Sequence, residues 1–207
     1  LVIHLRMTGQ LLYYPEEIEG DCYTRLVLTF ESSAQLHLRD VRALARITLL
    51  KADEVPRWDP FVQLGPEPFS DTFTVEALQN SLSKRRTAIK NVLLSQKAVA
   101  GLGNIYADEA LFRAQINPLR PANSLTLTEV SRLQTAIRQV LMDGIRYGGT
   151  SIRDYVNSAG TPGSNQEHLQ VYGRKGQKCH CCGTRLEGCR LGGRSTVYCP
   201  LCQPMMA

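Results

Sequence analysis

The stretch CHCCGTRLEGCRLGGRSTVYCPLC, Cys179 to Cys202, holds six of the chain's seven cysteines in 24 residues. Within it, Cys179 pairs with Cys182 and Cys199 with Cys202 in two Cys-x-x-Cys turns, 16 residues apart. Such a turn directs two thiolates toward one metal, and two facing turns give the tetrahedral four-sulfur shell typical of structural zinc. Because a closed shell leaves no position for water, we expect one Zn²⁺ that stabilises the fold and performs no chemistry.

A disulfide set or free thiols are the alternatives to a metal. We expect no secretory signal, and only Cys22 lies outside the cluster, so disulfides are disfavoured. His180, Cys181 and Cys189 fall outside the paired spacing, although His180 or Cys181 can compete for metal in vitro. The metal site is therefore predicted to consist of Cys179, Cys182, Cys199 and Cys202.

Charge is concentrated around this cluster. The chain has a net charge of +5, and the residues from 169 onward contain six Lys or Arg against one acidic residue. Residues 1–168 contain as many acidic as basic residues, so the whole excess of positive charge lies in and beside the cysteine cluster. Between the pairs, Leu191-Gly-Gly-Arg-Ser-Thr196 predicts a hairpin that presents Arg194. A solvated basic face is the plain interpretation, but a local field of this kind also favours a polyanion such as nucleic acid.

The rest of the chain divides into a strand-rich part and a helical part. Residues 1–50 alternate with a period of two, and 51–72 contain four prolines, which predicts a linker without regular structure. From Thr74 the apolar period becomes helical, and Thr126 with Glu129 fits a capping box that opens a helix ending at Gly148-Gly149. Residues 158–165 are small and polar, which predicts a mobile loop.

A second anion site is suggested by Gly101-Leu-Gly-Asn104, directly before a helix. Small residues let a phosphate approach the unpaired amides of a helix start, and Asn104 adds a donor. The motif alone is weak, because an ordinary tight connection has the same pattern. We expect Asp108 and Glu109, in the first turns, to complement the helix dipole, or Glu109 to pair with Arg113.

Together these residues resemble the bacterial formamidopyrimidine-DNA glycosylases over nearly the whole chain. The motifs that carry the resemblance are HLRMTGQL (4–11), LGPEPF (64–69), VAGLGNIYADEALFRAQINP (99–118), GGTSIRDYV (148–156), LQVYGRKGQ (169–177) and the two-pair cysteine ending. The resemblance implies an α+β fold: a β-sandwich remnant over 1–50, a linker over 51–72, a helix–two-turns–helix DNA-binding domain over 73–168 and a zinc-finger hairpin over 169–207. It also implies removal of 8-oxoguanine and formamidopyrimidines from DNA, followed by strand nicking through β,δ-elimination.

The resemblance further implies roles for single residues. Met7 matches an intercalating Met, Arg42 an Arg that pairs with the estranged base, and residues 158–168 a loop that closes over the flipped base. The groups that match clamps on the flanking phosphates are His4, Asn104, Tyr172 and Arg194, with Lys90 as a further candidate. Without the resemblance, Met7 would be taken as core and His4 as a satisfied strand histidine.

Several positions depart from the family pattern. Leu44 stands where a Phe wedge is usual, flanked by Ala43 and Ala45, and Arg6 replaces a glycine. Leucine can still wedge, but it loses aromatic stacking, so opposite-base discrimination is affected more than binding. The family's nucleophilic proline amine, adjacent Glu and assisting Lys match no residue here. We therefore expect a fragment whose chemical centre lies upstream of residue 1, and which binds DNA without turnover.

Two other interpretations remain open: an endonuclease VIII-like glycosylase acting on oxidised pyrimidines, and a non-catalytic binder of damaged DNA. In each case the expected partner is double-stranded DNA with oxidised bases or abasic sites. The resemblance implies a monomer associated with the bacterial nucleoid, and we expect it in the cytoplasm because no apolar run approaches the ~20 residues of a membrane helix.

Overall fold

The computed structural model describes residues 1–152 and 155–205, which form two compact units. The first unit combines residues 1–57 with 144–168, and the second combines 58–143 with 169–207. The predicted domains placed 144–168 with the helical middle, whereas the structure groups this segment with the strands. None of the helices among the described residues is both long and apolar enough to cross a bilayer.

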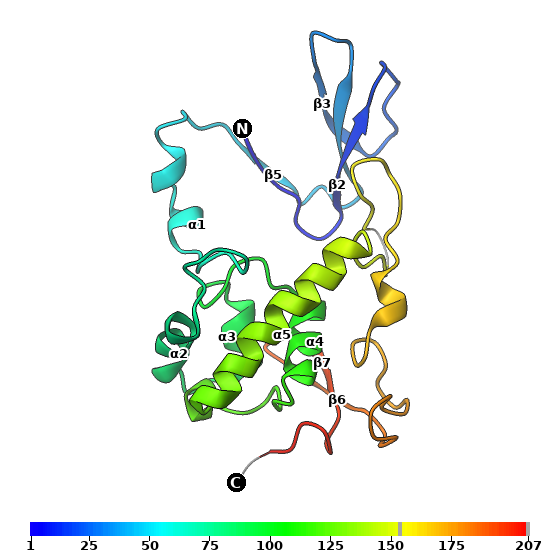
Figure 1. Cartoon of the computed structure of the whole chain (residues 1–207). Helices are drawn as coiled ribbons and strands as arrows, with labels where there is room; N and C mark the ends of the chain where they lie inside the picture. Colours follow the sequence, from blue (N-terminus) through cyan, green and yellow to red (C-terminus); the bar gives the residue numbers. More distant parts are fainter. Residues whose placement is uncertain (153–154, 206–207) are drawn as a thin grey trace. The chain divides into compact units, whose positions relative to one another are not determined.

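The first unit is built from short antiparallel strands, drawn in blue to cyan in Figure 1. A three-stranded sheet has the order β2-β4-β3, and a two-stranded sheet pairs β1 with β5. The strands are β1 Val2–His4, β2 Gly9–Tyr14, β3 Thr24–Thr29, β4 Gln35–Asp40 and β5 Arg46–Thr48. The central β4 is the most buried, as expected for a strand with neighbours on both sides, and Ser33 (φ 64°) lies in the turn before it.

Two expectations about the N-terminal half are wrong in detail. The alternation from residue 1 does not continue to Met7: β1 ends at His4, because Arg6 adopts φ 57° and reverses the chain. The linker is not free of regular structure, since it contains the 3₁₀ turn η1 Val55–Arg57 and the helical turn α1 Asp59–Val62. Pro60 lies in the first turn of α1, where a missing N–H costs nothing.

The second unit has a helical core. It contains α2 Val75–Ser83, α3 Ile89–Leu94, α4 Asn104–Arg113, the 3₁₀ turn η2 Ala122–Ser124 and most of α5 Leu127–Arg146. The apolar stripes meet there, and Leu78, Ile89, Leu111 and Ile137 are fully buried. Each such side chain contributes about 1.5–3 kcal/mol by leaving water.

The long helix α5 begins and ends where the sequence predicts. The Glu129 amide donates to the Thr126 hydroxyl (3.3 Å), and the Thr126 amide donates to the Glu129 carboxylate (2.8 Å), which is the reciprocal capping box. Gly148 and Gly149 follow the helix with φ of 69° and 97°, a backbone region that only glycine adopts readily.

Beyond the glycines, the chain is held by specific contacts rather than left as an open loop. Asn165–His168 form the 3₁₀ turn η3, and the His168 ring stacks on Tyr147 with centroids 3.9 Å apart. The Asn157 side chain accepts from the amides of Ala159 and Thr161. Arg153 and Asp154 of the GGTSIRDYV motif lie outside the described residues.

The cysteine-rich tail forms the predicted hairpin. Strands β6 Glu187–Leu191 and β7 Arg194–Tyr198 are antiparallel, and they are joined by Gly192 and Gly193 with φ of 55° and 76°. Two successive positive φ angles define the tight turn that matches strand twist, and they explain the Gly-Gly pair. Arg194 is the first residue of β7 and is exposed.

Candidate nucleic-acid interface and metal site

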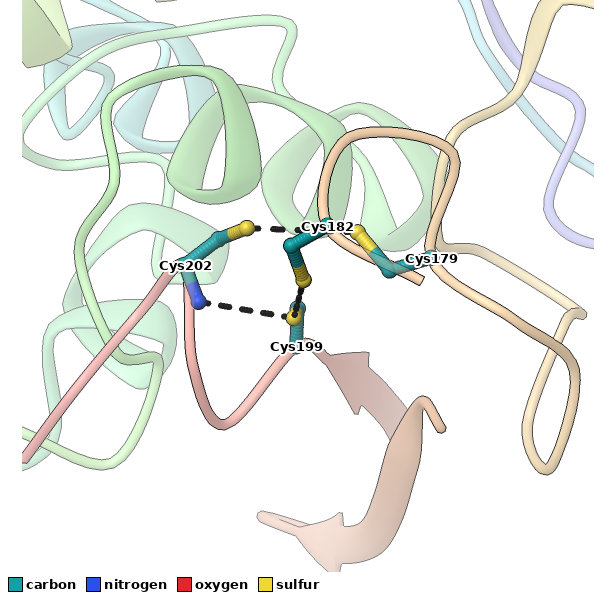
Figure 2. A group of neighbouring side chains, drawn as sticks. All are labelled: Cys179, Cys182, Cys199 and Cys202. Carbon is teal, nitrogen blue, oxygen red and sulfur yellow. Dashed lines mark hydrogen bonds between the residues drawn. The ribbon is translucent and has the colours of Figure 1, made fainter. Parts of the chain in front are cut away.

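The four predicted metal ligands converge on one point. Their sulfur atoms all lie within 4.8 Å of one another, with Cys182 Sγ 3.4 Å from Cys199 Sγ and Cys179 Sγ 3.9 Å from Cys202 Sγ. Figure 2 shows that one pair comes from the turn before β6 and the other from the turn after β7. Four sulfurs bound to a tetrahedral Zn²⁺ are roughly 3.8 Å apart, so the cluster fits such an ion.

The surroundings of the cluster act on its thiols in opposite directions. Hydrogen bonds from the Thr184 hydroxyl and amide lower the pKa of Cys182 to about 6, whereas burial raises the pKa values of Cys199 and Cys202, an effect that a bound cation would offset. Among the described residues, the metal-holding group contains only the four paired cysteines. Cys181 and Cys189 are exposed and outside it, as the spacing predicts.

The finger is packed against α4 rather than tethered loosely. Phe112 of α4 joins Val171, Leu186 and Val197 in a small apolar core that includes two of the cysteines. Gln203, fully buried, donates to the Ile116 carbonyl (2.8 Å) and accepts from the Cys199 amide (2.9 Å). The sequence did not single out Gln203, because no local pattern reveals a bond between residues 87 positions apart.

The start of α4 is joined to the same hairpin. Asn104, the first helical residue, donates from Nδ2 to the Ser195 carbonyl (3.1 Å), next to Arg194. A Cβ added at Gly103 would meet no atom within 4 Å, and its backbone (φ −88°, ψ −178°) is open to any residue. Neither packing nor conformation therefore requires glycine at position 103, and its small size leaves the helix start accessible to a ligand.

Lys90 does not lie on the surface as the phosphate-clamp prediction requires. Its side chain has no exposed area, and Nζ lies 2.7 Å from Asp108 Oδ1. It also donates to the Ser195 carbonyl (2.7 Å) and the Thr196 hydroxyl (2.9 Å). The prediction of a direct DNA contact is corrected: in this structure Lys90 links α3 and α4 to β7.

Burial dominates the electrostatics of this pair. Removal from water raises the pKa of Asp108 to about 6, although the Lys90 ammonium acts in the opposite direction. The other Asp108 oxygen accepts from the Val197 amide (3.1 Å), so the carboxylate is bound to both Lys90 and the hairpin. Asp108 is thus a structural group and not a dipole-complementing surface acid.

Glu109 also differs from its expected role. It does not pair with Arg113, which instead bonds Asp143 (2.9 Å). The buried Glu109 carboxylate accepts from three successive amides, those of Gln170, Val171 and Tyr172, at 2.8–2.9 Å. These bonds fix the backbone at residues 170–172, where the chain enters the finger. Tyr172 is half-buried there.

The remaining predicted residues lie in the first unit. His4 ends β1, and its Nδ1 accepts from the Arg6 amide (3.1 Å). Met7 and Leu44 are 61% and 44% exposed, which excludes a core role for Met7. Arg42 is exposed on the same turn as Leu44.

Asp40, which the sequence analysis did not assign, accepts hydrogen bonds from the hydroxyl of Thr8, next to Met7, and from the amides of Arg42, Leu44 and Ala45. Its position at the end of a strand, two residues before Arg42, is the sequence signal from which Asp40 could have been predicted. Asp side chains often accept hydrogen bonds from the amides of the turn that follows them.

Comparison with known proteins gives the same family in every case. Residues 1–47 match the formamidopyrimidine-DNA glycosylase N-terminal domain, and residues 64–156 match the formamidopyrimidine-DNA glycosylase H2TH domain. The chain is 46% identical over 204 residues to the formamidopyrimidine-DNA glycosylase of Bacillus cereus, and 47% identical over 202 residues to that of Desulfitobacterium hafniense. It covers 74% of each of these relatives.

Solved structures agree with the sequence relatives. A Lactococcus lactis Fpg mutant bound to Fapy-dG-containing DNA superposes with a TM-score of 0.90 at 35% identity, over 98% of this chain and 74% of that one. The Fpg complex from the same organism with abasic-site DNA gives 0.89 at 36% identity, with the same coverage. Thermus thermophilus MutM (Fpg) gives 0.88 at 38% identity, over 99% of this chain and 76% of that one.

Proposed function

The chain belongs to the formamidopyrimidine-DNA glycosylase family of base-excision repair, and we propose that its residues supply the DNA grip and the lesion readout of that activity. The proposed substrate is duplex DNA carrying oxidised purines, with strand opening by β,δ-elimination after the base is removed. The proposed metal is one structural Zn²⁺ on the four clustered cysteines. A monomer in the bacterial cytoplasm, at the nucleoid, is the matching cellular form.

One observation carries the proposal: the start of α4 and the finger hairpin are bonded to each other. Asn104 and Lys90 both donate to the Ser195 carbonyl, so the open helix start lies beside exposed Arg194. A helix start supplies unpaired amides, and Arg194 supplies a fixed charge, and both kinds of group bind phosphate. We assign Asn104 and Arg194 to the phosphates flanking a lesion.

The exposed residues of the first unit complete the proposal. Flexible, apolar Met7 and branched Leu44 suit insertion into a base stack, and Arg42 suits hydrogen bonding to a base edge. His4 and Tyr172 are assigned to further phosphate contacts. Lys90 is assigned a positioning role, since its ammonium is fully engaged with protein groups.

The test is a binding titration of the 207-residue chain with a duplex containing a central tetrahydrofuran, a stable abasic analogue, and with the same duplex undamaged. We expect tighter binding to the tetrahydrofuran duplex and weaker binding to both as salt rises, because bound cations release counterions. Arg194→Ala should weaken both complexes and reduce the salt slope by about 1.

Arg132, an exposed arginine of α5, provides the matched control. Arg132→Ala should leave affinity and slope unchanged. Equal affinity of the wild-type chain for the two duplexes, or an Arg194→Ala slope equal to that of the wild type, would contradict the proposal.

A further inference from the structure

Asp40 is a charged residue with no exposed surface at the end of β4. Its carboxylate accepts four hydrogen bonds. Oδ1 accepts from the Thr8 hydroxyl (2.6 Å) and the Arg42 amide (3.2 Å), and Oδ2 accepts from the amides of Leu44 (2.6 Å) and Ala45 (2.7 Å). The Thr8 hydroxyl is the largest of the influences that lower the pKa of Asp40, so the group is a carboxylate at neutral pH.

These four donors belong to two different turns. Thr8 lies in the turn over residues 5–9, which the Gly9 amide closes onto the Leu5 carbonyl (3.0 Å). The other donors lie in the turn over residues 41–45, where the Ala43 amide bonds the Asp40 carbonyl (3.3 Å). One side chain therefore joins two turns that are more than 30 residues apart in sequence.

Each turn contains backbone strain and an exposed apolar side chain. Arg6 (φ 57°) and Ala43 (φ 50°) adopt the left-handed region, which costs a residue with a Cβ about 1–2 kcal/mol. Such strain persists only where surrounding contacts impose it, and it concentrates at ligand clamps. Beside the strained residues, Met7 and Leu44 face solvent.

The sheet itself does not need this carboxylate. β2 and β4 pair continuously from Gly9–Asp40 to Tyr14–Gln35, and β3 covers the other edge of β4. The main-chain carbonyl of Asp40 is separately bonded by Arg25 Nε (3.0 Å). The side-chain bonds of Asp40 thus act on the two turns and not on the strands that carry them.

We propose that Asp40 is a positioning residue that locks the two turns together, so that Met7, Arg42 and Leu44 are presented to damaged DNA as one preformed set. This inference rests on the proposed function, because it takes the three side chains as the lesion-reading group. Preorganisation of this kind lowers the ordering cost of binding. It should therefore affect the preference for a lesion more than general affinity for a duplex.

The test measures two quantities on the full chain: the ratio of affinities for tetrahydrofuran and undamaged duplexes, and the fluorescence of 2-aminopurine placed beside the lesion, which rises when the base unstacks. Thr8→Val removes one bond to Asp40 and keeps the side-chain shape, whereas Thr8→Ser keeps the hydroxyl. Asp40→Asn keeps the shape of the side chain at position 40 and removes its charge. Asp21→Asn, at an exposed ion pair with Arg39 in the same unit, is the control.

We expect Asp40→Asn to lower the affinity ratio about tenfold and Thr8→Val about threefold, in line with loss of charge-assisted hydrogen bonds. Both variants should reduce the 2-aminopurine signal while undamaged-duplex affinity stays within about twofold. Thr8→Ser and Asp21→Asn should behave as wild type. If Asp40→Asn does not fold, the difference between Thr8→Val and Thr8→Ser tests the inference on its own.

The inference fails if Thr8→Val and Asp40→Asn retain the wild-type ratio and signal. It also fails if they weaken both duplexes equally, since that result indicates a purely structural role. A wild-type chain without lesion preference would instead overturn the proposed function, and the assignment of Asp40 with it.

Discussion

Lys90 and Asp108 carry opposite charges at a place in the second unit that water does not reach. A buried pair of this kind contributes little net stability compared with apolar residues, but removal of one partner leaves the other uncompensated. Here both partners also bond β7, so the pair fixes the hairpin against α4.

Lys90→Met should lower the free energy of unfolding by about 3–5 kcal/mol at pH 8. The pKa of Asp108 is already raised to about 6, and loss of the ammonium raises it further, so the proton is taken up more readily by the folded state. The stability that comes from protonation of Asp108 in the folded state is lost as the pH rises through this raised pKa. Denaturant unfolding should therefore show a smaller loss at pH 5 than at pH 8.

The double variant Lys90→Met/Asp108→Asn is the matched control. It removes both charges and leaves an amide oxygen to accept from the Val197 amide, so it should recover most of the loss. An unchanged stability of Lys90→Met at pH 8 would contradict the structural role of the pair.

Single-residue roles were the least predictable part of the sequence. The metal ligands could be assigned because their spacing alone defines the site. The roles of Lys90 and Glu109 could not be assigned, because a charged residue near a helix start is expected on the surface until its partners are known. Some of those partners, such as Ser195 for Lys90 and Gln170–Tyr172 for Glu109, lie 61 or more residues away in sequence.

At the scale of an element, α5 depends on its first turn. The buried Glu129 carboxylate completes the capping box with Thr126 and also binds the Arg120 guanidinium. The Arg120 hydrogen bond is the largest of the influences that lower the pKa of Glu129 to about 2. This carboxylate therefore stabilises the start of the helix only while it is ionised.

Glu129→Gln should lower the free energy of unfolding at pH 7 by about 3 kcal/mol, because Arg120 loses its buried partner. The depressed pKa means that the wild-type contribution is complete above about 4.5 and is lost as pH falls toward 2. Urea unfolding from pH 7 to pH 2 should thus show a smaller decline for the variant. Parallel curves for the two proteins over that range would contradict this assignment.

The finger is the second element with a specific requirement. Its apolar core is small, so the metal is expected to supply much of its folding free energy. Cys182→Ser should abolish binding of one zinc per chain, measured by elemental mass spectrometry, and should also abolish duplex binding. Cys181→Ser, at an exposed thiol outside the cluster, should keep both. Retention of stoichiometric zinc by Cys182→Ser would contradict the four-cysteine site.

Elements with a local signal were predicted well. The helical period from Thr74 located the start of α2, the capping box located α5, and the Gly-Gly pair located the β6–β7 turn. The errors arose where one residue changed the path of the chain. The turn at Arg6 ended β1 early, and Pro60 was compatible with a helical turn because it stands in the first turn of α1.

At the scale of the whole molecule, the strand-rich and helical parts could be predicted from the sequence, but the boundary between them could not. Residues 144–168 comprise the last residues of α5 and the segment that follows it, so the chain order assigned them to the helical part. Their contacts place them with the strands: the Tyr13 amide, for example, donates to the Ser158 carbonyl (2.8 Å). A long-range contact of this kind has no local pattern from which it could be predicted.

The tail that carries the excess positive charge packs against α4 in the second unit. The tail's hairpin is bonded to α4 through Asn104 and Asp108, so the start of α4 lies next to the strand that begins with Arg194. The central claim is that the start of α4 and this hairpin grip DNA as a unit.

Hydrogen–deuterium exchange of the zinc-loaded chain, with and without a tetrahydrofuran duplex, tests that claim most directly. Peptides covering residues 99–106 and 189–197 should both lose exchange on binding, and over the same range of duplex concentration. Protection of only one of the two peptides at saturating duplex would contradict it.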